Sequence, residues 1–167
     1  MIKKILLAIA IILPMSALAQ KFGVVEIETV FKAMPEYAAM ETQLSDASKK
    51  YEDEFQKLRT ELDKLYADFQ AIADDANTPQ SIKERRMQEI QERENKINQF
   101  RQTASQDLSR LQEQLIAPIQ QKFVDAIKAV GQEGNYTFIF PNEQNLLLYQ
   151  GADVVNVTNA VKTKLGL

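Results

Sequence analysis

The sequence contains no cysteine, no histidine and no tryptophan, and it has only five glycines in 167 residues. The absence of cysteine excludes disulfides, and the absence of histidine removes the commonest metal ligand and the usual general base of enzymes. The glycines are scattered, and neither a P-loop nor a dinucleotide-binding motif occurs. The many carboxylates lie beside Lys and Arg, as on a solvated helix surface. We therefore predict a protein that is not an enzyme and has no metal or other cofactor.

A long apolar run occurs only at the N-terminus. A basic start, Met1 to Lys4, precedes apolar residues from Ile5 to Met15, and the sequence Ala17-Leu18-Ala19 follows. This order is typical of a cleaved secretory signal peptide over residues 1–19, and the run is too short to span a bilayer without further apolar flanks. We expect an exported protein without stable membrane insertion. Removing Lys3 and Lys4 leaves 18 basic and 23 acidic residues, so no bulk attraction for nucleic acid is expected.

Two apolar stripes with steps of three and four predict two long helices, over 36–76 and 79–130. The first stripe comprises Tyr37, Met40, Leu44, Ala47, Tyr51, Phe55, Leu58, Leu62, Leu65, Phe69, Ile72 and Ala76. The second comprises Ile82, Met87, Ile90, Ile97, Phe100, Ala104, Leu108, Leu111, Leu115, Ile119, Phe123, Ile127 and Val130. Stripes this narrow are typical of a seam between helices. With a turn near 74–79, they predict an antiparallel helical hairpin, or arm, over 36–130.

The second stripe is sparse at its start. Between Ile82 and Ile97 the apolar positions are few, and Arg86 and Arg93 crowd the stripe. We therefore expect the tip of the arm to be more loosely packed than its base.

Residues 20–35 and 131–167 predict a small β-rich body, so the fold class is α+β. Strands are expected at Phe22–Ile27, Tyr136–Phe140 and Leu146–Tyr149, followed by a last helix. A sheet of this size is marginal as a core, and its strands are apolar on both faces. We expect the body to bury one face by oligomerisation. The candidate interface residues are Phe22, Val24, Phe138, Phe140, Leu146 and Leu148.

The order of parts carries a family resemblance. A signal and a strand lead to Val30–Tyr37, which opens the hairpin; the chain returns through Leu115–Ile119 and closes with Asp153–Thr158 and a helix. Over essentially the whole mature chain, this resembles the Skp/OmpH family of periplasmic chaperones. The resemblance implies a jellyfish-like homotrimer in the periplasm, whose arms surround a cavity. There it would hold unfolded outer-membrane β-barrel proteins without ATP and prevent their aggregation.

Tyr66, Met87 and Phe100 are the candidate client-contact residues on the arm. For Phe100 in particular, simple packing within the hairpin is the competing interpretation. Well-known members of the family are basic, whereas this chain is acidic, so the binding of lipopolysaccharide is not expected to carry over. Helical periodicity alone also fits a non-catalytic structural or adaptor protein of the cell envelope, or a secreted signalling or adhesion factor.

Overall fold

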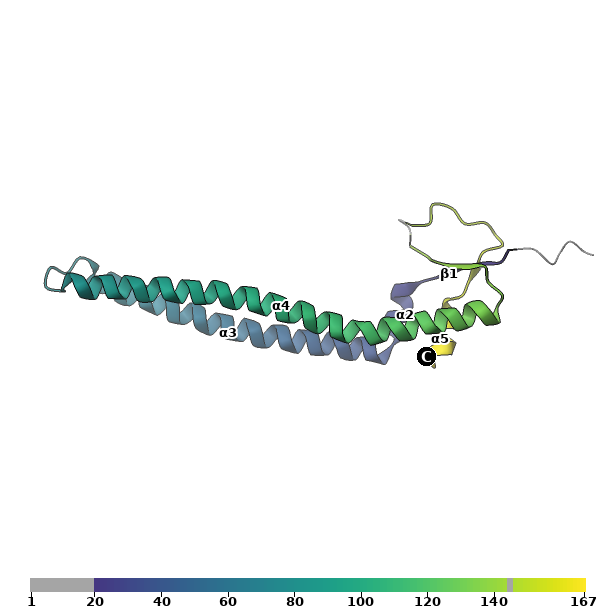
Figure 1. Cartoon of the computed structure of the whole chain (residues 1–167), viewed down its shortest axis with the longest axis horizontal. Coiled ribbons are helices and arrows are strands. Elements are labelled where there is room, and N and C mark those ends of the chain that lie inside the picture. The colour runs from purple at the N-terminus through teal and green to yellow at the C-terminus, as the bar shows by residue number, and fades with distance from the viewer. Residues whose placement is uncertain (1–19, 144–145) are drawn as a thin grey trace, which may run out of the picture. The chain divides into compact units, whose positions relative to one another are not determined.

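The computed structural model of the chain describes residues 20–143 and 146–167, so the predicted signal peptide lies outside the described residues. The elements follow in the order β1 (Phe22–Val25), α2 (Ile27–Ala33), α3 (Pro35–Ala73), α4 (Gln80–Glu133), β2 (Phe138–Pro141), β3 (Val155–Asn156) and α5 (Thr158–Leu165) (Figure 1). This confirms the predicted fold class of long helices with a small sheet. The chain divides into two compact units. We call Pro35–Gln120 the hairpin unit, and residues 20–34 with 121–167 the sheet unit.

Within the hairpin unit, α3 and α4 run antiparallel. The Tyr51 hydroxyl donates to Oδ2 of Asp107 at 2.9 Å, and the Tyr66 hydroxyl donates to Oε1 of Glu94 at 2.6 Å. Because the partner on α4 moves back along the chain as the residue on α3 moves forward, these contacts confirm the predicted direction of the hairpin.

Burial along α3 follows the predicted stripe. Its apolar positions from Tyr37 to Ile72 are buried or half-buried, and nearly all residues between them are exposed. A seam between two helices shields only one edge of each side chain, so Met40 is the single fully buried residue of α3. Ala76, predicted to extend the stripe, is exposed in the turn because α3 ends at Ala73.

The start of the second stripe was assigned wrongly. Ile82 and Met87 are 39% and 41% exposed, whereas Lys83 and Arg86 are half-buried. Counting back from the buried Ile90 in helical steps of four and three reaches Arg86 and then Lys83. Charged residues therefore occupy the seam positions at this end of α4.

The turn between the long helices is organised by one carboxylate. Oδ1 of Asp75 accepts a hydrogen bond from the backbone N–H of Asn77 at 2.9 Å, and Oδ2 accepts one from the Thr78 hydroxyl at 2.7 Å. Such a turn, in which an Asp side chain bonds backbone two residues on, lets the chain reverse without a glycine. The Lys83 ammonium donates to the carbonyl of Ala73 at 2.7 Å, which gives a backbone carbonyl at the C-terminal end of α3 a hydrogen-bond partner.

The sheet unit contains a parallel three-stranded sheet in the order β2-β1-β3. The strand predicted at Leu146–Tyr149 is wrong: the described residues there form a turn and a bend, and Val155–Asn156 supplies the third strand instead. The first predicted strand also ends early, at Val25, and Ile27 begins the short helix α2. An apolar run becomes a strand only if another strand satisfies its backbone, and no described strand pairs with Leu146–Tyr149.

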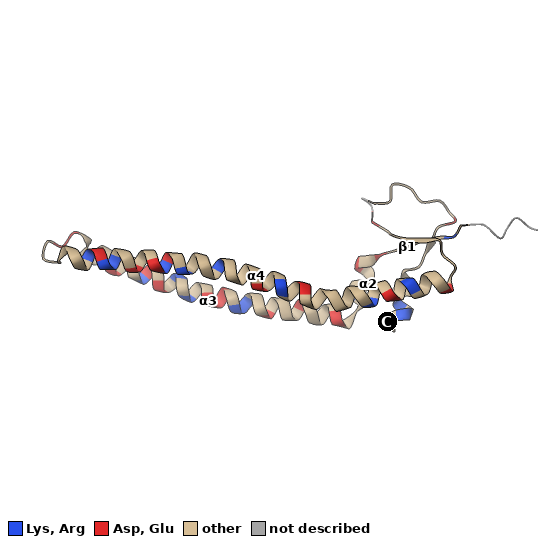
Figure 2. Ribbon diagram, in the orientation of Figure 1, with Lys and Arg blue, Asp and Glu red and all other residues tan. Residues whose placement is uncertain are grey.

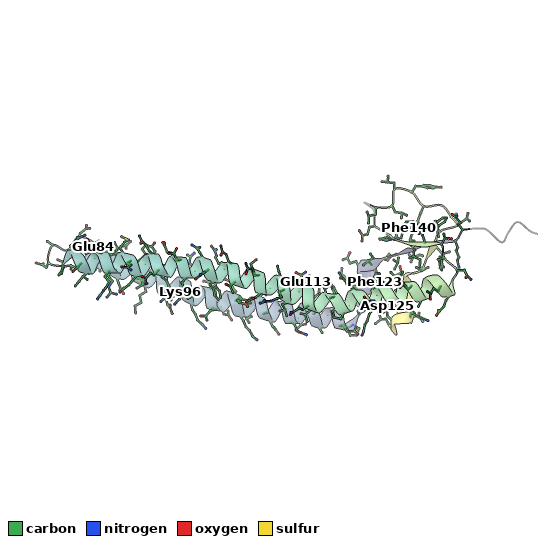
Figure 3. The ribbon with its side chains drawn as sticks, viewed as in Figure 1. Glu84, Lys96, Glu113, Phe123, Asp125 and Phe140 are labelled. Carbon is green, nitrogen blue, oxygen red and sulfur yellow. The ribbon has the colours of Figure 1, made fainter. Side chains whose placement is uncertain are left out.

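The core of the sheet unit joins both ends of the chain. Its buried side chains come from β1, α2, the end of α4, α5 and the residue before α5: Val25, Val30, Phe123, Ala126, Val130, Val157 and Val161. Phe123, labelled in Figure 3, meets Phe31 edge to face with 5.0 Å between the ring centroids. Oδ1 of Asn156 accepts a hydrogen bond from the backbone N–H of Thr158 at 2.9 Å, which satisfies the first N–H group of α5.

Candidate interaction surfaces

Apolar side chains remain exposed on the sheet unit. Phe138 and Phe140 on β2 are 56% and 43% exposed, and Leu148 in the loop is 96% exposed. The rings of Phe22 and Phe138 stack with their centroids 6.3 Å apart, and Phe138 lies 5.7 Å from Phe140 in the same measure. We call the set Phe22, Phe138, Phe140, Leu146 and Leu148 the apolar patch. Single exposed apolar residues are ordinary, but neighbouring exposed aromatic rings are typical of an interaction site.

The alternation along β2 explains why this surface is left open. Successive side chains of a strand point to opposite faces, so Ile139 packs on the core while Phe138 and Phe140 face away from it. The parallel register pairs Phe22 with Phe138, which places both rings on the same face. The three aromatic rings therefore lie on the face of the sheet opposite that of Ile139.

Val24 was predicted as an interface residue, but it is only 1% exposed within the single chain. It lies on the central strand, flanked by Phe140 and Asn156 in the sheet register. Because its side chain is already covered inside the unit, it has no free surface to offer a partner. The other five predicted interface residues are half-buried or exposed.

The three predicted client-contact residues differ in their surroundings. Phe100 is half-buried, and its ring lies 5.9 Å from that of Tyr51, so it packs in the seam. Tyr66 is 38% exposed, with its hydroxyl held by Glu94. Met87 is 41% exposed. Tyr66 and Met87 therefore present apolar area to solvent, whereas Phe100 presents little.

Comparison with known proteins gives a family. The model of the family described as outer membrane protein (OmpH-like) matches residues 21–165. The chain belongs to the OmpH-like family. The crystal structure of an OmpH-like protein from Caulobacter crescentus CB15, described as a candidate outer membrane chaperone, has a TM-score of 0.70 and 16% identity, covering 88% of this chain and 84% of that one. At this identity the similarity establishes a common fold. No curated protein sequence matches the chain significantly.

The described residues of this OmpH-like chain hold no group of three or more acidic side chains placed to bind a metal ion. None of its described helices is long and apolar enough to cross a membrane. Figure 2 shows acidic and basic residues interspersed along α3 and α4. The hairpin unit carries 17 acidic and 12 basic residues, so the excess of negative charge in residues 20–167 lies there.

Two tyrosines connect the helices of this OmpH-like hairpin. The hydrogen bond to Asp107, with partial burial and the negative charge of that carboxylate, raises the pKa of the Tyr51 hydroxyl above its usual value. Glu94 raises the pKa of Tyr66 for the same reasons. A raised pKa favours the neutral hydroxyl in the folded state. The contribution of both contacts to stability is therefore present at neutral pH and lost as the pH rises through the raised pKa.

Sequence reasoning missed four exposed apolar residues of the sheet unit. They are Val124, Tyr149, Val155 and Leu167, which are 41%, 87%, 41% and 42% exposed. Tyr149 ends the apolar run that begins at Leu146, so its exposure follows from the absence of the predicted strand. It also missed Lys83 as a seam residue. The spacing from Ile90 carried that signal, but Ile82, one residue away, is the more apolar choice.

Proposed function

We propose that this OmpH-like protein is an ATP-independent holdase of the periplasm, which binds unfolded outer-membrane proteins after its own export and prevents their aggregation. The observation that carries the proposal is the family match over residues 21–165. The description of the Caulobacter protein as a candidate outer membrane chaperone supports it. The paired helices of the hairpin unit add a long surface with exposed apolar side chains.

The apolar patch supports the second part of the proposal, a homotrimer assembled through the sheet units. Each chain exposes Phe138, Phe140 and Leu148 to solvent when alone. Covering these side chains with another copy removes apolar area from water at about 25 cal/mol per Å². A small sheet with exposed apolar side chains thus gains stability by self-association.

An unfolded barrel protein exposes alternating apolar side chains that find no cover in water. Several weak contacts in one cavity raise the effective concentration of each next contact, so holding and release are compatible. Tyr66 and Met87 offer such contacts without disturbing the seam of the hairpin. The excess of acidic residues on the hairpin unit disfavours lipopolysaccharide, whose phosphates are anionic, because like charges repel.

The test uses two unrelated outer-membrane barrel proteins unfolded in urea and diluted into buffer without ATP. Light scattering should show that the purified mature protein suppresses aggregation of both, and size-exclusion chromatography with light scattering should give a homotrimer. Specific binding to one folded envelope protein, with no effect on either barrel, would instead identify a structural adaptor and contradict the proposal.

A further inference from the structure

The end of the hairpin unit near the turn has a seam of mixed chemistry. Lys83, Arg86 and Arg93 are half-buried at the inner positions of α4, where Ile90 and Ile97 are the buried residues. The facing positions of α3 are all apolar: Leu62, Leu65, Phe69 and Ile72. We call these four residues the distal stripe.

Cross-hairpin contacts place the cations against this stripe. The Arg93 guanidinium pairs with Glu61 at 2.7 Å, and the Lys83 ammonium reaches the Ala73 carbonyl at 2.7 Å. These contacts indicate which residues of the two antiparallel helices lie opposite each other, or level. By residue count, Arg93 is level with Leu62, and Lys83 is level with Ile72. By the same count, Arg86 is level with Phe69 and Ile90 with Leu65. In three of these four pairs, an apolar side chain of α3 thus lies opposite a cation of α4.

A pair made of a cation and an apolar residue holds the two helices together only weakly. A long cationic side chain covers an apolar neighbour with its methylene stem but turns its charged head to water or to a carboxylate. Arg86 does this by pairing with Glu89 of its own helix at 2.7 Å, which leaves α3 uninvolved. Nearer the sheet unit the same seam is aliphatic and aromatic, with Leu108, Leu111 and Leu115 on α4. Opening therefore costs least at the turn end.

Leu65 already borders solvent. It lines a surface hollow with Glu89 and Arg93 of α4. A small outward movement of α4 at this end would extend that hollow along the distal stripe.

We propose that the distal stripe is a binding surface for an unfolded polypeptide segment that carries both apolar and basic side chains, and that it opens when α4 moves away from α3 near the turn. The side chains that cover the stripe now indicate the chemistry of the ligand: α4 covers it with Ile90 and three cations. The residues that flank the stripe also favour a ligand with basic side chains, since Glu61, Asp63 and Asp68 are exposed beside it. This inference rests on the proposed holdase function and names the surface that performs it.

The experiment closes the hairpin reversibly. Because the chain has no cysteine, Leu65→Cys with Ile90→Cys gives the only two thiols, and a short reducible reagent can bridge them. The matched control bridges Ala47→Cys with Leu108→Cys, which are level in the aliphatic part of the seam. Binding is measured with an unfolded apolar and basic peptide and with an unfolded barrel protein. Bridging at 65 and 90 should weaken both affinities roughly tenfold, reduction should restore them, and the control bridge should change neither.

A second set of variants avoids the bridge. Replacing Lys83, Arg86 and Arg93 together by Leu should slow hydrogen exchange near the turn and weaken binding. Arg85→Leu adds an apolar residue at an exposed position of the same turn of helix and should do neither. Equal binding by open and closed forms, with the triple variant also unimpaired, would overturn the distal stripe while the holdase function stands. Failure of the unsubstituted protein to hold any client would instead overturn the proposed function.

Discussion

Phe123 is the side chain on which the core of the sheet unit most depends. It is 6% exposed, and its ring contacts that of Phe31. Phe123→Ala should lower the free energy of unfolding by about 3–5 kcal/mol, since a buried ring is removed and a cavity is left. Urea denaturation followed by circular dichroism measures the change.

The neighbouring residue provides the control for that substitution. Val124 is 41% exposed on the same turn of α4, so Val124→Ala should change the free energy of unfolding by no more than about 0.5 kcal/mol. Equal losses for the two variants would mean that Phe123 does not lie in a packed core, and the description of the sheet unit would be wrong.

The turn between α3 and α4 depends on a charged carboxylate at the scale of the element. Hydrogen bonds from the backbone of Asn77 and from the hydroxyl of Thr78 hold the pKa of Asp75 below its usual value. A carboxyl whose pKa is lowered by folding adds stability above its unfolded pKa, and this addition is lost as the pH falls through the folded pKa. Asp75→Ala should therefore lower the melting temperature at pH 7, and the difference from the parent should shrink in acid.

Thermal melts of both proteins between pH 7 and pH 2 test this expectation. Asp74 is the control because it is adjacent and exposed but, among the described residues, makes none of the hydrogen bonds of Asp75. Asp74→Ala should leave the melting temperature nearly unchanged at both ends of the range. A pH-independent effect of Asp75→Ala would show that its charge does not stabilise the turn.

At the scale of the whole molecule, the apolar patch should decide the oligomeric state. Phe138→Asp or Leu148→Asp would bury a carboxylate between subunits, and an unpaired buried charge costs several kcal/mol. Both residues are more than half exposed in the single chain, so the subunit itself should still fold. Light scattering should show dissociation to monomers, with loss of aggregation suppression.

Leu167→Asp is the control for the patch variants, since Leu167 is 42% exposed at the end of the chain. It should preserve both the assembly and the holding of clients. A Phe138→Asp protein that is monomeric yet still prevents aggregation would separate holding from assembly and contradict the proposed trimer.

The hairpin could be predicted from the sequence because each of its helices is determined by residues that lie close together in the chain. Helix hydrogen bonds join residues four apart, and one stripe of apolar residues defines the buried edge, so α3 and α4 follow the predicted seam from Tyr37 onward. The exception at the start of α4 arose from choosing the most apolar residue, Ile82, over the residue in register, Lys83. A seam shared with only one helix tolerates such a cation because its head reaches solvent.

The sequence by itself thus determined the two long helices, their reversal near Asp75 and the excess of apolar residues in the small sheet. Only the tertiary structure decided which strands pair, because a strand's hydrogen-bond partners lie far away in the chain and no local pattern names them. It placed Val155–Asn156 beside β1 where Leu146–Tyr149 was expected, and it buried Val24 while leaving Phe138 exposed. Local periodicity identifies a helix, but the partner of a strand depends on the whole fold.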